Sequence, residues 1–265
     1  MEPSEVEQTL EDVDASLRAY EKRAITGDNI PNNLYERPFT AYEMLYQPDI
    51  NILTVSVAAD ENFFYFTMVL DGLNPDVNAL TGTYGIEFDR TKTGRGDLLV
   101  WVHSPQEEWS LENLIVFTDL KGVVGGPNPI LANEGFEGEV YKTTLLLEGD
   151  RVAYARILQA EQPNLQFAIS RELLDNAKEF LWGGWADNGL KNPLLFDYND
   201  HLGPSQAGSP IRDSGDYPLK ELYILDNTCR LPYGFTPDSN IPGLCSSAIP
   251  QPIPQSAPPR PQPGP

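Results

Sequence analysis

Short hydrophobic segments recur at regular intervals between residues 50 and 225, and this pattern constrains the fold more than any other feature of the chain. The segments are rich in β-branched and aromatic residues, and polar turns separate them, as in antiparallel sheets. Strands are expected over residues 50–58, 63–70, 84–89, 98–103, 114–120, 141–147, 151–159, 165–169, 180–185 and 219–225. About ten strands with little helix predict a mainly β fold, an antiparallel β-sandwich of the jelly-roll kind.

Two helices are expected beside the strands. Hydrophobic residues that include Val6, Leu10 and Leu17 recur at steps of three and four, which predicts an amphipathic N-terminal helix over residues 4–25. Ser170 is expected to cap one short internal helix. The narrow hydrophobic stripe of the N-terminal helix requires a packing partner, which is either the sandwich itself or a helix of another molecule.

We divide the chain into an N-terminal helical segment (1–28), a single sandwich domain (29–247) and a Pro-rich tail (248–265). The tail contains eight prolines and a single charged residue, so an extended spacer without a core is expected. Within the domain, residues 188–218 are rich in Asn, Asp, Gly and Pro and predict a long irregular loop.

Cys229 and Cys245 are the only cysteines, and they stand in a turn-rich stretch just before the tail. We expect a disulfide that closes the last loop of the domain and stabilises it by about 3 kcal/mol. Two free thiols are the alternative, whereas a zinc site would need further ligands and no histidine lies near. Because disulfides persist in oxidising compartments, the pair favours a secreted or cell-surface location.

The net charge of −21 disfavours binding to nucleic acid and to anionic membranes. No hydrophobic run approaches the ~20 residues that span a bilayer, so no membrane span is expected. The first residues are acidic and lead to no hydrophobic signal-peptide core. We therefore expect a secreted or cell-surface protein whose signal peptide is absent from this sequence, and an intracellular protein is the alternative.

Three segments resemble the DOMON-like superfamily, which includes family 9 carbohydrate-binding modules and related haem-binding domains. Residues 57–66 resemble its paired strands with an Asp-containing turn, residues 84–89 its next strand, and residues 165–174 its strand followed by a short helix. The resemblance covers residues 50–185 and implies a β-sandwich that binds rather than catalyses, often with structural calcium. Residues 185–245 resemble the C-terminal part of uncharacterised secreted bacterial proteins, which agrees with the expected location.

Flat aromatic side chains are a common contact surface for sugars, with polar groups nearby to orient the ligand. Trp101, Trp109, Trp182 and Trp185 are therefore the candidate ligand-binding residues. Trp182 and Trp185 flank two glycines where a ligand could approach the backbone, and Trp109 follows two glutamates that favour exposure. Core packing is the alternative for each of them.

Two groups of oxygen-bearing side chains are candidate calcium sites. The first is the Gly-rich turn between Asp89 and Asp97, where central Arg and Lys residues oppose a cation and an ordinary hairpin loop is the alternative. The second comprises Asp187, Asp197, Asn199 and Asp200. Turns that hydrogen-bond their own backbone are the alternative there. No nucleotide is expected because phosphate-binding motifs are missing, and no haem because the chain has only two histidines and no attachment motif.

Together these features predict a non-catalytic binding module for a glycan or another cell-surface polymer, with structural calcium. A structural or adhesion domain that self-assembles through the N-terminal helix is the first alternative. A glycoside hydrolase is the second, because the 39 acidic residues could supply a catalytic pair although no pair stands out.

Overall fold

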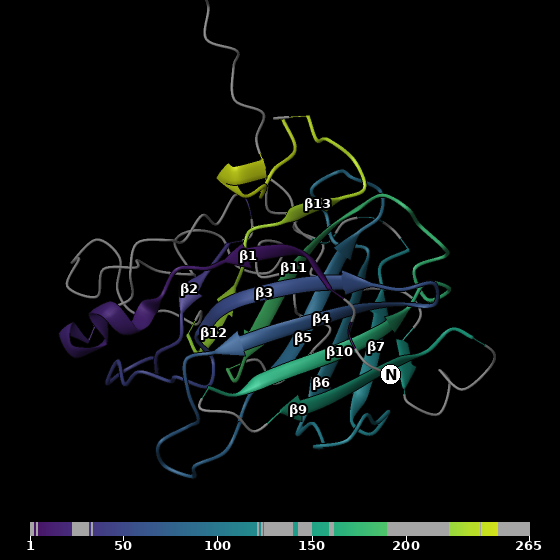
Figure 1. The fold of residues 1–265 in the computed structure, drawn as a ribbon. Helices are drawn as coiled ribbons and strands as arrows, with labels where there is room; N and C mark the ends of the chain where they lie inside the picture. Colours follow the sequence, from purple (N-terminus) through teal and green to yellow (C-terminus); the bar gives the residue numbers. More distant parts are fainter. Residues whose placement is uncertain are drawn as a thin grey trace, which may run out of the picture.

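In the computed structural model, two antiparallel β-sheets pack face to face as a sandwich (Figure 1). The structure describes residues 3, 5–22, 32, 34–120, 122, 124, 140–142, 150–158, 162–189, 223–238 and 240–248. The two packed antiparallel sheets confirm the expected mainly β, sandwich-like architecture. Within those residues, no helix is long and apolar enough to cross a membrane.

The first sheet, nearest the viewer in Figure 1, has five strands in the order β1-β3-β4-β10-β9. Its strands are β1 (Val6–Glu11), β3 (Ile52–Ala59), β4 (Phe63–Leu70), β9 (Ala153–Leu158) and β10 (Asn164–Ser170). We call this the five-stranded sheet. The strand β1 lies at one edge of it and β9 at the other.

The second sheet follows the order β2-β12-β11-β5-β6-β7-β8, and β13 pairs with β11 beside that path. Its strands are β2 (Glu36–Arg37), β5 (Thr83–Asp89), β6 (Leu98–His103), β7 (Leu114–Thr118), β8 (Val140–Lys142), β11 (Phe180–Asp187), β12 (Leu225–Asn227) and β13 (Leu231–Tyr233). The strand β2 lies at one edge, so each sheet has an edge strand from the first part of the chain.

The core lies between the sheets and follows from the alternation of side chains along each strand. On β4, Phe64, Phe66 and Met68 point into the core and are fully buried, whereas the residues between them face outwards. The Phe66 ring lies 5.4 Å from that of Phe88 and 5.2 Å from that of Trp182, centroid to centroid. Because Phe88 and Trp182 belong to the second sheet, Phe66 joins the two layers.

Most strand predictions agree with the structure. The strands β4 and β6 have the predicted bounds, and six others differ from prediction by at most two residues at either end. The strand expected over 219–225 is displaced, since β12 covers Leu225–Asn227, and residues 219–222 lie outside the described residues. The short strands β2 and β13 were not predicted, because two or three residues carry no detectable periodicity.

The predicted N-terminal amphipathic helix is wrong. Residues 6–11 form β1, which pairs with β3 so that Leu10 lies opposite Val55, and a 3-10 helix (η1, Ala15–Glu21) follows. Leu10 is buried, but Leu17 is exposed, so the two do not share one face. The free edge of β3 offers β1 backbone hydrogen-bond partners, and this tertiary pairing outweighs a local helical pattern. The segment 1–28 therefore contributes a strand to the sandwich.

The predicted short internal helix is a series of hydrogen-bonded turns over residues 171–176. Ser170 caps it as expected, because its Oγ accepts a hydrogen bond of 3.1 Å from the Leu173 N–H. The same oxygen also accepts from the Val152 N–H at 3.0 Å. One hydroxyl thus holds the turns at the end of β10 against the start of β9.

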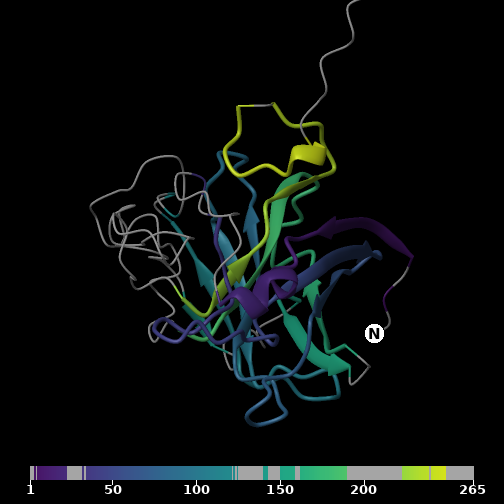
Figure 2. The same cartoon turned by 90° about the vertical axis from the view of Figure 1, so that its left-hand side faces the viewer.

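The predicted disulfide between Cys229 and Cys245 is present, with a Cα–Cα distance of 5.0 Å. Between the two cysteines, Arg230 donates its N–H to the Gly243 carbonyl and accepts from the Cys245 N–H through its own carbonyl. A short 3-10 helix (η4, Ser246–Ala248) follows. Figure 2 shows this segment, in yellow, at the upper end of the sandwich. Residues 249–265, which include most of the Pro-rich tail, lie outside the described residues.

Candidate functional site

Three of the four candidate tryptophans are part of the interior. Trp182 and Trp185 are 0% and 1% exposed, and Trp101 is 4% exposed. The indole nitrogen of Trp182 donates to Gln8 Oε1 at 3.1 Å, and that of Trp185 donates to Glu87 Oε2 at 3.2 Å. These buried rings offer no face to a ligand in solvent, and the Trp182 ring packs in the hydrophobic core between the two sheets.

The two glycines between Trp182 and Trp185 also serve packing. A Cβ at Gly184 would lie 2.9 Å from Val55 Cγ2, a side chain of the opposite sheet. At Gly183 it would lie 3.1 Å from Thr228 Oγ1. The absence of side chains at these two positions therefore lets the opposite sheet and the segment after β12 pack closely against β11, and it does not make room for a ligand.

Trp109 is the one candidate tryptophan that reaches the surface, where it lies half-buried on the outer face of the five-stranded sheet. The Arg156 guanidinium lies 4.3 Å from the centroid of its ring. Arg156 is itself oriented by a 2.8 Å hydrogen bond from its Nε to Gln166 Oε1. The Tyr65 ring lies 6.4 Å from that of Trp109, centroid to centroid.

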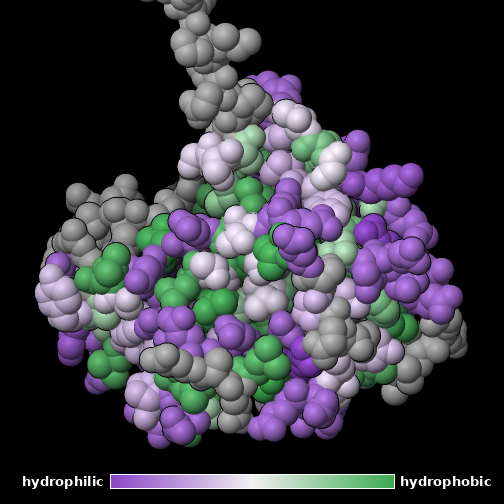
Figure 3. Space-filling model, in the orientation of Figure 1, coloured by the Kyte–Doolittle hydropathy of each residue, from purple (hydrophilic) through white to green (hydrophobic). Residues whose placement is uncertain are grey.

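Two further half-buried aromatic side chains, Phe63 on β4 and Tyr154 on β9, extend this surface, and the buried Tyr65 ring supports it. The Phe63 ring lies 6.0 Å from Tyr65 and 6.3 Å from Tyr154. We call Phe63, Tyr65, Trp109 and Tyr154 the outer aromatic cluster. Figure 3, which views this side of the molecule, shows hydrophobic surface interrupted by hydrophilic residues and no single continuous apolar patch. The cluster is therefore a mixed surface, suited to a ligand that is itself part apolar and part polar.

A hollow of about 360 Å³ adjoins the outer aromatic cluster. Phe63 and Tyr154 form part of its wall, and Arg171 and Ser170 contribute at the end of β10. The remaining polar side chains around it are Glu61, Asn62, Asp150, Glu172 and Asn176. We call this the polar hollow. Its aromatic wall and its hydrogen-bonding groups meet at Phe63 and Tyr154, the two residues that it shares with the cluster.

A turn in front of β4 holds one side of the polar hollow in place. Asp60 Oδ1 accepts hydrogen bonds of 2.7 Å from the N–H groups of Asn62 and Phe63, and Oδ2 accepts one of 2.8 Å from the Tyr65 hydroxyl. Burial acts to raise the pKa of the Asp60 carboxyl, but these hydrogen bonds and the nearby charge of Arg171 lower it overall. The ionised carboxylate thus fixes the backbone that presents Phe63.

A second, larger hollow of about 920 Å³ lies elsewhere on the molecule. Ile157 and Pro163 contribute to it from the end of β9 and the approach to β10, whereas the polar hollow lies near the start of β9 and the end of β10. None of its described lining residues is aromatic. It lacks the combination of ring faces and polar groups found at the polar hollow.

The first predicted calcium site is a self-contained hairpin loop. Asp89 Oδ1 accepts from the Thr91 hydroxyl at 2.8 Å, and its Oδ2 accepts from the Gly94 N–H at 2.6 Å. Asp97 accepts from the backbone N–H and the Nε of Arg90. Burial raises the pKa of the Asp97 carboxyl although Arg90 acts to lower it. Both carboxylates thus accept hydrogen bonds from groups of their own loop, as expected for an ordinary hairpin loop.

The second predicted calcium site cannot be assembled from the described residues. Asp187 is buried at the end of β11. Asp197, Asn199 and Asp200 lie outside the described residues.

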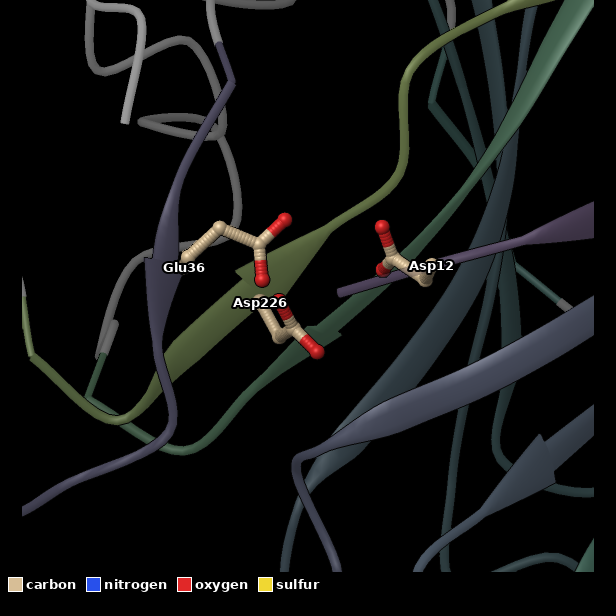
Figure 4. Close-up of side chains that lie close together, drawn as sticks. All are labelled: Asp12, Glu36 and Asp226. Carbon is tan, nitrogen blue, oxygen red and sulfur yellow. The ribbon is translucent and has the colours of Figure 1, made fainter. Parts of the chain in front are cut away.

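The structure brings together three carboxylates that the sequence did not indicate: Asp12, Glu36 and Asp226 (Figure 4). One oxygen of each lies within 4.8 Å of the others. Burial raises the pKa of Asp12 from 3.8 to about 7, against the opposing effect of hydrogen bonds with Val13 and Glu36. We call these three residues the carboxylate cluster. Because they come from distant parts of the sequence, only a contact prediction would have found them.

No family model, no curated protein and no solved structure matches this chain.

Proposed function

We propose that this protein is a secreted or cell-surface, non-catalytic module that binds a neutral glycan across the outer aromatic cluster and the polar hollow. One observation carries the proposal: Phe63 and Tyr154 belong to both surfaces, so aromatic faces and polar groups meet at one place. The resemblance of residues 57–66 and 165–174 to the DOMON-like superfamily is consistent with this proposal, since both segments border the polar hollow.

The chemistry of a sugar matches such a surface. A pyranose ring has an apolar face of C–H groups, which packs on an aromatic ring, and a rim of hydroxyls, which need hydrogen-bond partners. At the polar hollow, Asn62, Asn176 and the surrounding carboxylates supply acceptors for hydroxyl donors. The half-buried rings of Phe63 and Tyr154 supply the apolar contact.

The charge of the site favours a neutral sugar over an acidic one. Glu61, Asp150 and Glu172 surround the polar hollow, with Arg171 among them. The chain as a whole carries a net charge of −21. An anionic polysaccharide would approach against this field, whereas a neutral glycan pays no such electrostatic penalty. The disulfide is compatible with the extracellular location that such a ligand requires.

A glycan array, followed by isothermal titration of the best ligand, tests the proposal. Tyr154→Ala and Trp109→Ala are each expected to weaken binding about tenfold or more, which is about 1.4 kcal/mol. Tyr42→Ala is the matched control, because Tyr42 is an exposed aromatic residue outside the cluster, and it should leave affinity unchanged. The proposal fails if no neutral glycan binds, or if binding survives both substitutions at full strength.

A further inference from the structure

We propose that Asp12, Glu36 and Asp226 form a site for a hard divalent cation, with Ca²⁺ as the best-fitting ion, that joins the open edges of the two sheets. This inference does not depend on the glycan proposal, because the cluster uses other residues and other strands.

The carboxylate cluster lies where the edges of the two sheets meet. Asp12 directly follows β1, the edge strand of the five-stranded sheet, and Glu36 lies on β2, the edge strand of the second sheet. Asp226 lies on β12, the neighbour of β2, and is paired in register with Glu36. Figure 4 shows Asp12 opposite Glu36, with Asp226 beside them. An ion bound here would hold strands of both sheets.

Backbone hydrogen bonds and strand pairing position these three residues independently of any ion. Asp226 is fully buried, and its Oδ2 accepts a 2.7 Å hydrogen bond from the Ile52 N–H of β3. The Asp12 N–H donates to the Leu53 carbonyl at 3.0 Å. Both residues are thus attached to the start of β3, and the pairing of β2 with β12 holds Glu36 beside Asp226. The three carboxylates converge because the fold places them there, and they do not converge through a flexible loop.

The electrostatics of the cluster require compensation. Asp12 Oδ2 is buried and accepts no hydrogen bond within the described part of the chain. Glu36 and Asp226 are buried as well and make other interactions of their own. Burying an oxygen that lacks a donor costs free energy, and like charges this close oppose one another's ionisation. A shared proton, as in the hydrogen bond between Asp12 and Glu36, or a bound cation must offset this cost, and Asp12 Oδ2 has no donor among the described residues.

The geometry fits a calcium-sized ion. Ca²⁺ binds six to eight oxygens at about 2.3–2.6 Å, so two ligands on opposite sides of it lie up to about 5 Å apart. The three carboxylate oxygens lie within 4.8 Å of one another, so an ion placed between them lies within about 2.8 Å of each, and a small shift of the side chains completes Ca²⁺ contact. Second carboxylate oxygens and water can complete the shell. Mg²⁺ demands shorter distances and keeps several waters, which suits a buried, all-carboxylate cluster less well.

The test compares the whole chain after EDTA treatment with the same protein in CaCl₂, by thermal unfolding and by calorimetric titration of Ca²⁺. The melting temperature of the wild type is expected to rise by at least about 5 °C in excess Ca²⁺. Asp12→Asn and Glu36→Gln should each abolish that rise. In EDTA, Asp12→Asn should melt at or above the wild type, because it removes one of three opposing charges. Asp76→Asn, an exposed loop substitution, should retain the full effect of Ca²⁺.

Two results would overturn the proposal. One is a wild type whose melting temperature and titration do not respond to Ca²⁺, Mg²⁺ or Mn²⁺, which would leave a shared proton as the compensation. The other is a Ca²⁺ effect that persists in both cluster variants, which would place the ion elsewhere. If one variant fails to fold, the other decides. Should both fail, Asp12→Glu, which keeps the charge, must bind Ca²⁺ with an altered affinity for the proposal to stand.

Discussion

Arg230 and Glu87 form a buried ion pair that joins the C-terminal segment to the centre of the second sheet. Arg230 Nη2 donates to Glu87 Oε2 at 3.0 Å, and both side chains are 3% exposed. Trp185 donates to the same carboxylate, and Arg230 Nη1 donates to the Gly94 carbonyl at 3.3 Å. One pair thus links β5, β11, the hairpin loop after β5 and the disulfide-bonded segment.

Breaking this pair on one side is expected to be costly. Arg230→Met leaves the Glu87 carboxylate buried without its cation, and the free energy of unfolding should fall by about 3–5 kcal/mol. Replacing both partners, as in Glu87→Leu with Arg230→Met, should restore much of the loss because no charge then stays buried. Urea denaturation of the two single variants and the double variant measures this. Additive losses in the double variant would contradict the prediction.

The disulfide is expected to stabilise the end of the domain. It joins two cysteines that lie 16 positions apart in the sequence, and its removal should lower the free energy of unfolding by about 3 kcal/mol. The Cys229→Ala/Cys245→Ala variant and the wild type in reductant should unfold at the same, lower urea concentration. Thiol counting must first establish full reduction. An unchanged midpoint in fully reduced protein would show that the hydrogen bonds of Arg230 suffice.

Asp60 should make stability depend on pH in the acidic range. Its pKa is lower in the folded protein than the ordinary value of 3.8, because hydrogen bonds outweigh the effect of burial. The unfolded chain therefore binds more protons in this pH range. The stabilisation by the Asp60 carboxylate is complete above the ordinary, unfolded pKa and is lost as pH falls through the lower, folded pKa. Asp60→Asn should cost about 1 kcal/mol at pH 6, and this difference should shrink as pH falls below 3.8 through the folded pKa. Urea denaturation across that range gives the two curves, and a constant difference between them would refute the assignment.

Leu10 and Leu17 should differ sharply in their effect on stability. Leu10 is 2% exposed and packs in the core, so Leu10→Ala should cost about 2–5 kcal/mol. Leu17 is 70% exposed, so Leu17→Ala should change the free energy of unfolding by less than about 0.5 kcal/mol. An amphipathic helix with both residues on one face would give two similar costs. Equal losses in urea denaturation would therefore contradict β1.

The strands were the most predictable part of this protein. Residues 63–70 alternate between core-facing and outward-facing side chains, and this period of two is visible in the letters alone. The pairing of Cys229 with Cys245 was equally accessible, because no other cysteine exists. Strand β1 was misread because one buried residue, Leu10, cannot distinguish a period of two from one of 3.6. Residues 6–11 form a strand because the edge of β3 offers them backbone hydrogen-bond partners.

The candidate sites depended on which residues the fold covers. Trp182 and Trp109 are chemically alike, yet β11 is buried along all eight of its residues whereas the outer face of the five-stranded sheet is partly open. Asp12, Glu36 and Asp226 carry no common motif, and they meet only because the end of β1 lies beside the paired strands β2 and β12 of the other sheet. The sequence by itself determined the fold class, most strands and the disulfide, because these follow from local periodicity and from a unique pair of cysteines. The tertiary structure alone decided which tryptophan is exposed and which carboxylates are neighbours, because burial and long-range proximity depend on what packs against each strand.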